Sequence, residues 1–115
     1  MTFSEFEIKR CEMSVAKFIR KRRPPPHLRD EVDLAFRIVN QSVEIHEIRA
    51  HWEDASRKVE SPIAKATYNK RRRNWKVFWR RADLKWHGYT PRLVVPSIED
   101  FLDVVDKDEY GCFFG

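Results

Sequence analysis

Residues 64–79 read AKATYNKRRRNWKVFW, and this stretch predicts a β-hairpin. With Arg71 and Arg72 at its tip, a small alanine opposes a larger side chain in the cross-strand pairs Ala64–Trp79 and Ala66–Val77, and Tyr68 opposes Trp75. Pairs of this kind fill one face of a packed sheet. A longer loop fits the tip equally well, because four cations stand there in a row without a glycine. The stretch therefore predicts two antiparallel strands with one dry face.

An earlier hairpin is predicted in residues 34–45, LAFRIVNQSVEI. If Asn40 and Gln41 form the turn, three pairs agree in register, namely Phe36–Ile45, Ile38–Val43 and the opposite charges Arg37–Glu44. Residues 52–61, WEDASRKVES, are polar and are expected to form a loop. Leu84 and Trp86 share one parity, which favours a short fifth strand or an irregular extension in residues 82–89.

Helices are predicted at both ends of the chain. Ser4 and Glu7 have the spacing of a capping box, and the prolines of residues 24–26 stop the helix that follows. Ser97 is placed to cap a last helix with the apolar stripe Ile98, Phe101, Leu102 and Val105, and the end of the chain is expected to dock. The predicted fold is a single α+β domain, residues 1–115. A mostly antiparallel sheet of four to five strands is flanked by an N-terminal and a C-terminal helix, which cover one face.

The 115 residues carry a net charge of +5 that is unevenly distributed. Residues 65–92 hold ten Lys or Arg and one acid, whereas residues 93–115 hold one Lys and six acids. Such a chain either binds an anionic partner or covers its own basic surface with its acidic end. The acids that would do the covering are Asp100, Asp103, Asp106, Asp108 and Glu109.

Cysteine and histidine positions give no sign of a metal or cofactor site. Cys11 and Cys112 lie far apart and are expected to be reduced thiols, and the four histidines have no ligand spacing. Single histidines in strands usually pack or form hydrogen bonds. The N-terminus does not resemble a signal peptide and no segment is apolar enough for a membrane span, so we expect a soluble cytoplasmic protein.

Several strings of the sequence resemble one family. They are QSVEIHEIRAHW, SPIAKATY, NWKVFW, RADLKWHGY and the ending YGCFFG. The chain resembles, over roughly residues 34–115, a small bacterial family described as domain of unknown function 3024, and RADLKWH and CFFG are the most specific strings. The resemblance implies a bacterial α+β domain and implies no activity.

The basic and aromatic segment of residues 70–86 is the candidate site. Cations can neutralise phosphates, and flat rings can stack on bases or fill a core. Trp75, Trp79 and Tyr68 are expected in the core, while the parity of Phe78 places it among cations. The predicted nucleic-acid-binding residues are Lys70, Arg71, Arg72, Arg73, Lys76, Phe78, Arg80, Arg81, Lys85 and Trp86.

Two other functions remain open at this point. The same strip of Trp and Arg residues suits a protein–protein interface, for example in a homodimer that meets the acidic C-terminal helix of another copy. A metal-dependent hydrolase would need acids gathered on one strand face. Glu44 and Glu47 point to opposite faces, and Arg49 cannot act as the catalytic lysine of a nuclease. We therefore predict low-specificity nucleic-acid binding without catalytic residues.

Overall fold

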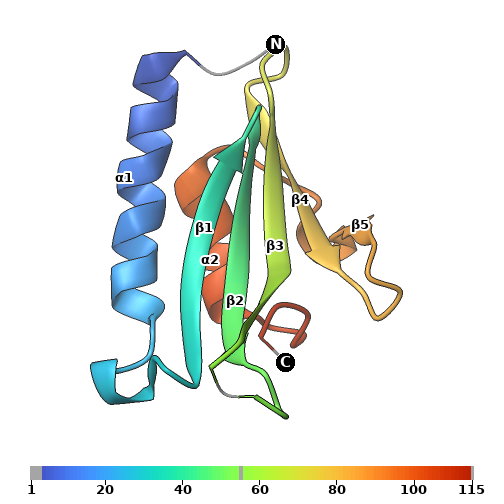
Figure 1. Ribbon diagram of the computed structural model, residues 1–115. Coiled ribbons are helices and arrows are strands. Elements are labelled where there is room, and N and C mark those ends of the chain that lie inside the picture. Colours follow the sequence, from blue (N-terminus) through green and yellow to red (C-terminus); the bar gives the residue numbers. More distant parts are fainter. Residues whose placement is uncertain (1–3, 55, 115) are drawn as a thin grey trace.

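In the residues that the structure describes, six strands form one antiparallel sheet in the order β1-β2-β3-β4-β5, with β6 paired to β4 (Figure 1). These residues are 4–54 and 56–114 of a computed structural model. The strands are β1 Val32–Val39, β2 Ser42–Ala50, β3 Lys58–Asn69, β4 Asn74–Arg80, β5 Trp86–Gly88 and β6 Val94–Val95. The predicted α+β class is confirmed, with β6 as a short strand beyond those expected.

Two α-helices, α1 (Glu5–Arg22) and α2 (Ile98–Lys107), and two 3-10 helices, η1 (Pro26–Leu28) and η2 (Thr90–Arg92), complete the described fold. The hydroxyl of Ser4 accepts a hydrogen bond from the N–H group of Glu7, so α1 begins as the capping-box spacing predicts. The helix ends just before the proline run, as predicted.

Both hairpins have the predicted register. In β1 and β2, Phe36 lies opposite Ile45 and Ile38 opposite Val43. In β3 and β4 the pairs Ala64–Trp79, Ala66–Val77 and Tyr68–Trp75 all occur, and pairing continues to Asn69 and Asn74. The tip of this second hairpin is therefore the longer of the two loops considered, residues 70–73.

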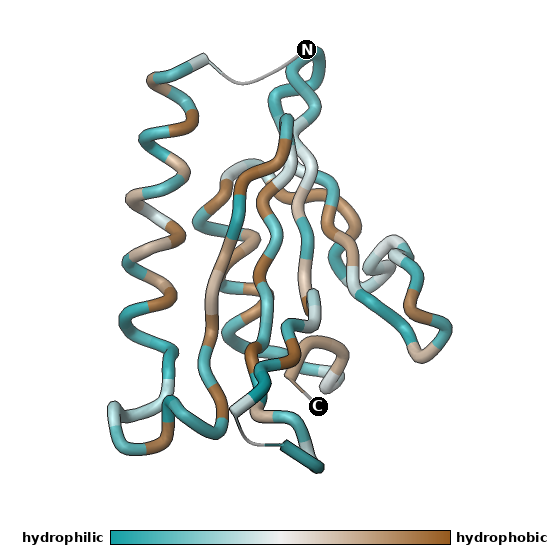
Figure 2. The backbone as a smooth tube through the Cα atoms, viewed as in Figure 1, coloured by the Kyte–Doolittle hydropathy of each residue, from teal (hydrophilic) through white to brown (hydrophobic). Residues whose placement is uncertain are grey.

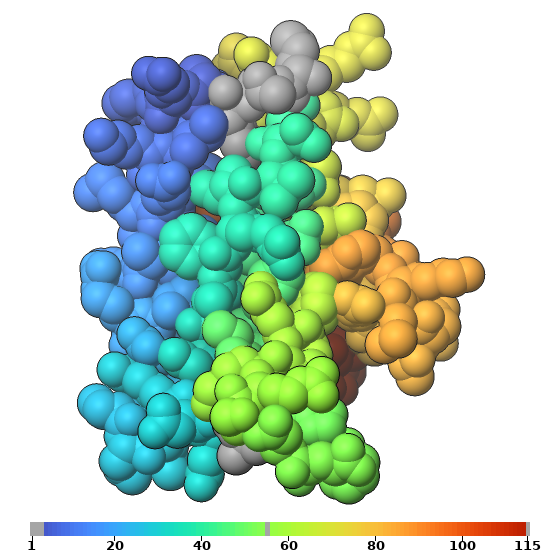
Figure 3. All heavy atoms as spheres, viewed as in Figure 1, coloured from blue at the N-terminus to red at the C-terminus, as the bar shows by residue number. Residues whose placement is uncertain are grey.

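The core lies on one face of the sheet. Val43, Ile45, Ala64, Ala66 and Val77 are inaccessible to solvent and pack with the buried residues of both helices. Figure 1 shows α1 beside β1 and α2 behind the strands. Over the described residues, no helix covers the opposite face, which is turned towards the viewer in Figure 3. We call this second surface the open face.

One local expectation was wrong. β3 begins at Lys58, inside the segment that its polarity predicts to be a loop, because its backbone pairs with β2 beyond a register shift between Ile45 and His46. A β-bulge of this kind lets a strand continue while its side-chain pattern changes. Both alternatives predicted for residues 82–89 occur, because Leu84 lies in an irregular turn with φ of 63° and a short fifth strand follows from Trp86 to Gly88.

The side chain of Ser97 caps the start of α2 and is expected to stabilise this helix. The hydroxyl of Ser97 accepts a hydrogen bond from the N–H group of Asp100 at 3.1 Å. Replacing a capping serine by alanine leaves that N–H group without its partner, so Ser97→Ala should destabilise the protein by about 1 kcal/mol in urea unfolding. Ser61→Ala, at an exposed position of β3, is the matched control and should change stability by less than about 0.5 kcal/mol.

Candidate nucleic-acid interface

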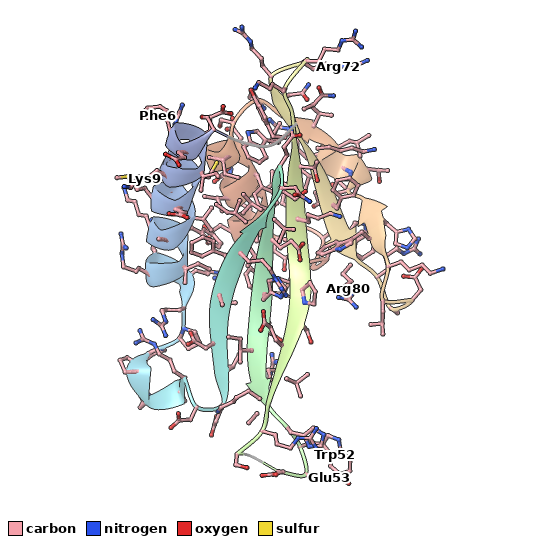
Figure 4. The ribbon with its side chains drawn as sticks, turned by 45° about the horizontal axis from the view of Figure 1, so that its top comes forward. Phe6, Lys9, Trp52, Glu53, Arg72 and Arg80 are labelled. Atoms are coloured by element: carbon pink, nitrogen blue, oxygen red, sulfur yellow. The ribbon has the colours of Figure 1, made fainter. Side chains whose placement is uncertain are left out.

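The loop between β3 and β4, which we call the cationic tip, consists of Lys70, Arg71, Arg72 and Arg73. The side-chain oxygen of Asn69 accepts hydrogen bonds of 3.1 Å from the backbone N–H groups of Arg71 and Arg72. Arg73 closes the loop with φ of 53°, in the left-handed region that usually favours glycine. All four side chains are exposed, the loop is hydrophilic (Figure 2), and Arg72 projects away from the domain (Figure 4).

Rings and cations alternate on the open face of β4. Lys76, Phe78 and Arg80 share this face, and Trp86 of β5 lies opposite Arg80. The ammonium of Lys65 lies 4.8 Å from the ring centroid of Phe78 and 4.9 Å from that of Trp86. The ammonium of Lys76 lies 5.3 Å from the Phe78 ring. These distances are those of cation–π contacts, so both rings are already in a cationic environment.

Lys65 belongs to this group although the sequence-based prediction of site residues left it out. It lies opposite Phe78 in β3, and its side chain is half-buried between the two rings. Burial lowers the pKa of Lys65, and Glu44 on the neighbouring strand opposes that shift. The parity of residues 64–69 could have identified Lys65 as a site residue, because it places the side chain on the face of Lys76 and Phe78.

Arg81 and Lys85 lie apart from the tip, in the loop that follows β4. The guanidinium of Arg81 lies 5.5 Å from the ring centroid of Trp79, whose side chain packs against the core. Asp83 in the same loop accepts a hydrogen bond from the backbone N–H of Lys85 and bonds His87 at 2.8 Å. Seven strand residues, about 23 Å of chain, separate this loop from the cationic tip. The predicted site is therefore not one patch.

The acids of the C-terminal region form their contacts on the helix side of the sheet. Asp103 pairs with Lys107 at 3.0 Å, and Asp106 with Arg22 at 3.7 Å. The carboxylate of Asp108 accepts hydrogen bonds from the backbone of the C-terminal segment. Across the described part of the chain, no ion pair joins these carboxylates to the cations of residues 70–85. The cationic tip is thus open rather than covered by the protein's own acidic end.

A buried histidine lies on the β1–β2 side of the open face. His46 is inaccessible to solvent, and its Nε2 accepts a 3.0 Å hydrogen bond from Arg37. Glu44 Oε1 lies 3.3 Å from the same Nε2, and Glu60 Oε1 lies 3.1 Å from Nδ1. Burial and the charge of Arg37 lower the pKa of His46, while Glu60 and Glu44 oppose them. His46 is accordingly a packed strand histidine, as its isolated position predicts.

Because the pKa of His46 is lowered, the stability of the protein should depend on pH. The unfolded chain takes up a proton near pH 6.5 while the folded chain does not, so stability contributed by neutral His46 is present above about pH 6.5 and is lost below it. We expect urea unfolding to show lower stability at pH 5.5 than at pH 7.5, with a contribution of at most about 1.4 kcal/mol per pH unit.

His46→Gln should reduce this pH dependence, because glutamine does not titrate. His27→Gln is the matched control, since His27 is exposed and its substitution should leave the pH dependence unchanged. A pH dependence equal in wild type and His46→Gln would show that another group is responsible.

The two cysteines are free, and no group of three or more potential metal ligands is found among the described residues. Burial raises the pKa of Cys11 to about 11, with Glu99 contributing, so this thiol stays protonated near neutral pH. Neither described α-helix is long and apolar enough to cross a lipid bilayer. Glu44 and Glu47 lie on opposite faces of β2, as their spacing predicts.

Comparison with known families assigns the chain to a family but gives no activity. A family described as a domain of unknown function (DUF3024) matches residues 3–115. The chain belongs to this family. The match confirms the resemblance seen in residues 34–115 and extends it across α1 of this DUF3024 domain. No curated protein and no solved structure matches the chain. A function for this DUF3024 domain therefore has to be argued from its own geometry.

Proposed function

We propose that this DUF3024 domain binds nucleic acid without catalysis and with little base specificity, through the cationic tip and the open face of β4. The observation that supports the proposal best is the exposure of Lys70, Arg71, Arg72 and Arg73, none of which has an ion-pair partner among residues 4–54 and 56–114. Clustered cations of this kind are the electrostatic footprint of a phosphate-binding surface.

The expected low specificity follows from the nature of the contacts. Exposed arginines on a loop contact phosphate oxygens, which are the same for every sequence, and ring stacking tolerates all four bases. Lys76, which is exposed, continues the positive surface from the tip along β4, and the half-buried Arg80 lies at the far end of that strand. We further propose a cytoplasmic location, because both cysteines are free and a reducing compartment keeps thiols in that state.

Salt dependence is the experiment that tests the proposal. Each neutralised phosphate contributes a log–log slope of about −0.7 on single strands and −0.9 on duplex. Three to four contacts at the tip then predict an affinity that falls roughly 20- to 150-fold between 50 and 200 mM salt. Fluorescence anisotropy with a labelled oligonucleotide measures it. Equal affinities at both salt concentrations, or no binding at either, would overturn the proposal.

A homodimer is the second candidate, and the distribution of charge favours it. The exposed acids Asp103 and Asp106 of α2 lie on the helix side of the sheet, away from the cationic tip. One copy therefore does not cover its own tip with these acids, whereas the α2 helix of a second copy could contact it. Size-exclusion chromatography with light scattering separates the two candidates. A dimer that persists in salt and ignores oligonucleotides would favour the homodimer.

A further inference from the structure

The rings of Phe78 and Trp86 lie on the sheet face that has no helix over it. Both side chains are half-buried, yet neither belongs to the hydrophobic core or to the residues packed against it. Tyr68 of β3 and Trp79 of β4 do pack against that core. Within the described residues, core packing therefore accounts for Trp79 and Tyr68 but not for the positions of Phe78 and Trp86.

The surroundings of these two rings carry positive charge. Lys65 holds its ammonium within 5 Å of both ring centroids, 4.8 Å from Phe78 and 4.9 Å from Trp86. Lys76 stands between Phe78 and the cationic tip along β4. Surfaces that bind single strands combine aromatic rings for the bases with cations for the phosphates, and both kinds of side chain lie together here, with the ammonium groups over the rings.

The acidic part of the open face lies on β2 and the start of β3. Glu44 of β2 and Glu60 of β3 contact the buried His46, and Arg37 of β1 bonds the same histidine. A polyanion is therefore directed along β4, β5 and the tip end of β3 and away from this acidic region. From the tip to the level of Trp86, this path runs along seven residues of β4, about 23 Å.

We infer that the ligand of this surface is single-stranded nucleic acid, lying along β4 with its phosphates at the cationic tip and near Lys65 and Lys76, and with bases stacked on Phe78 and Trp86. A duplex hides the faces of its bases inside the stack, so it leaves both rings without a partner, whereas a single strand exposes them. The inference depends on the proposed function, because it names the substrate of the same site.

The experiment compares one labelled twelve-nucleotide single strand with its own duplex at a fixed 100 mM salt, by fluorescence anisotropy. Wild type should bind the single strand at least about tenfold more tightly. Phe78→Leu and Trp86→Leu should each weaken single-strand binding about 5- to 100-fold and leave duplex binding nearly unchanged. Trp86→Phe keeps an aromatic ring at this position and should therefore retain most of the single-strand affinity.

Trp52→Leu is the matched control. Trp52 is 86% exposed and lies at the other end of the sheet from the tip (Figure 4), so its substitution should change neither affinity. Duplex binding as tight as single-strand binding, or leucine variants that bind like wild type, would overturn the inference while leaving nucleic-acid binding in place. Absence of binding to both ligands by wild type would instead overturn the proposed function itself.

Discussion

Neutralising the cationic tip will weaken nucleic-acid binding roughly 100- to 500-fold at 0.1 M salt. The variant is the triple substitution of Lys70, Arg71 and Arg72 by glutamine, which leaves the left-handed Arg73 in place. Each lost phosphate contact removes a factor of roughly 5 to 8 at this salt concentration, and the log–log salt slope should become shallower by about 2 to 3. Anisotropy titrations of wild type and variant at several salt concentrations measure both quantities.

A variant with the same change in net charge provides the control. Lys9, Lys17 and Arg20 are exposed on α1, and Figure 4 shows Lys9 pointing away from the sheet. Their triple substitution by glutamine should change the affinity by less than about threefold, because these side chains belong to α1 and not to the tip or β4, and exposed charges are partly screened by salt. If both triple variants lost affinity equally, binding would depend on net charge and the tip would have no special role.

Replacing Phe101 by alanine will destabilise the domain by about 3–5 kcal/mol. Phe101 of α2 is inaccessible to solvent and belongs to the core between the helices and the sheet. Removing its ring costs the transfer free energy of the buried atoms and leaves a cavity that neighbouring side chains fill only in part. Small domains are stable by only about 5–15 kcal/mol, so a large share of the total would be lost. Urea or thermal unfolding measures the change.

The matched control is the same substitution at an exposed phenylalanine. Phe6 on α1 is 78% exposed, and its side chain projects from the helix in Figure 4. Phe6→Ala should change stability by less than about 0.5 kcal/mol. A Phe101→Ala variant as stable as Phe6→Ala would mean that Phe101 of α2 is not buried in the core.

The fold was predictable where cross-strand pairs of side chains allow only one register between two strands. The pairs Ala64–Trp79 and Phe36–Ile45 occur as predicted, because a one-residue slip would turn their apolar side chains to the open face. Helix ends were predictable from hydroxyl caps at Ser4 and Ser97, whose hydrogen bonds are local in sequence.

The start of β3 was not predictable, because it depends on a strand that is distant in sequence. Residues 58–61 are exposed and, apart from Val59, polar, and only their backbone pairing with β2 makes them a strand. The register shift at Ile45 and His46 likewise has no local signal. Polar strands with a single partner are difficult to distinguish from loops, since strand propensity reflects packing against neighbours.

The sequence predicted which types of residue form the candidate site, but not that they lie in two separate groups. All ten residues lie in or next to β4 and β5, yet Arg81 and Lys85 are separated from the cationic tip by the length of β4. The openness of the tip depends on where the acids of α2 lie, and those acids pair on the far side of the sheet with Arg22 and Lys107. The number of charges along the sequence does not show on which side of the sheet these acids lie.

The most direct test of the account is a map of the surface that contacts the ligand. Amide and arginine side-chain NMR signals of ¹⁵N-labelled protein would be followed while a twelve-nucleotide single strand is added. The account predicts the largest shifts at Lys70 to Arg73, then at Lys76, Phe78 and Trp86, with little change on the outer face of α1. Shifts confined to α1 or α2, or no shifts at low salt, would contradict it.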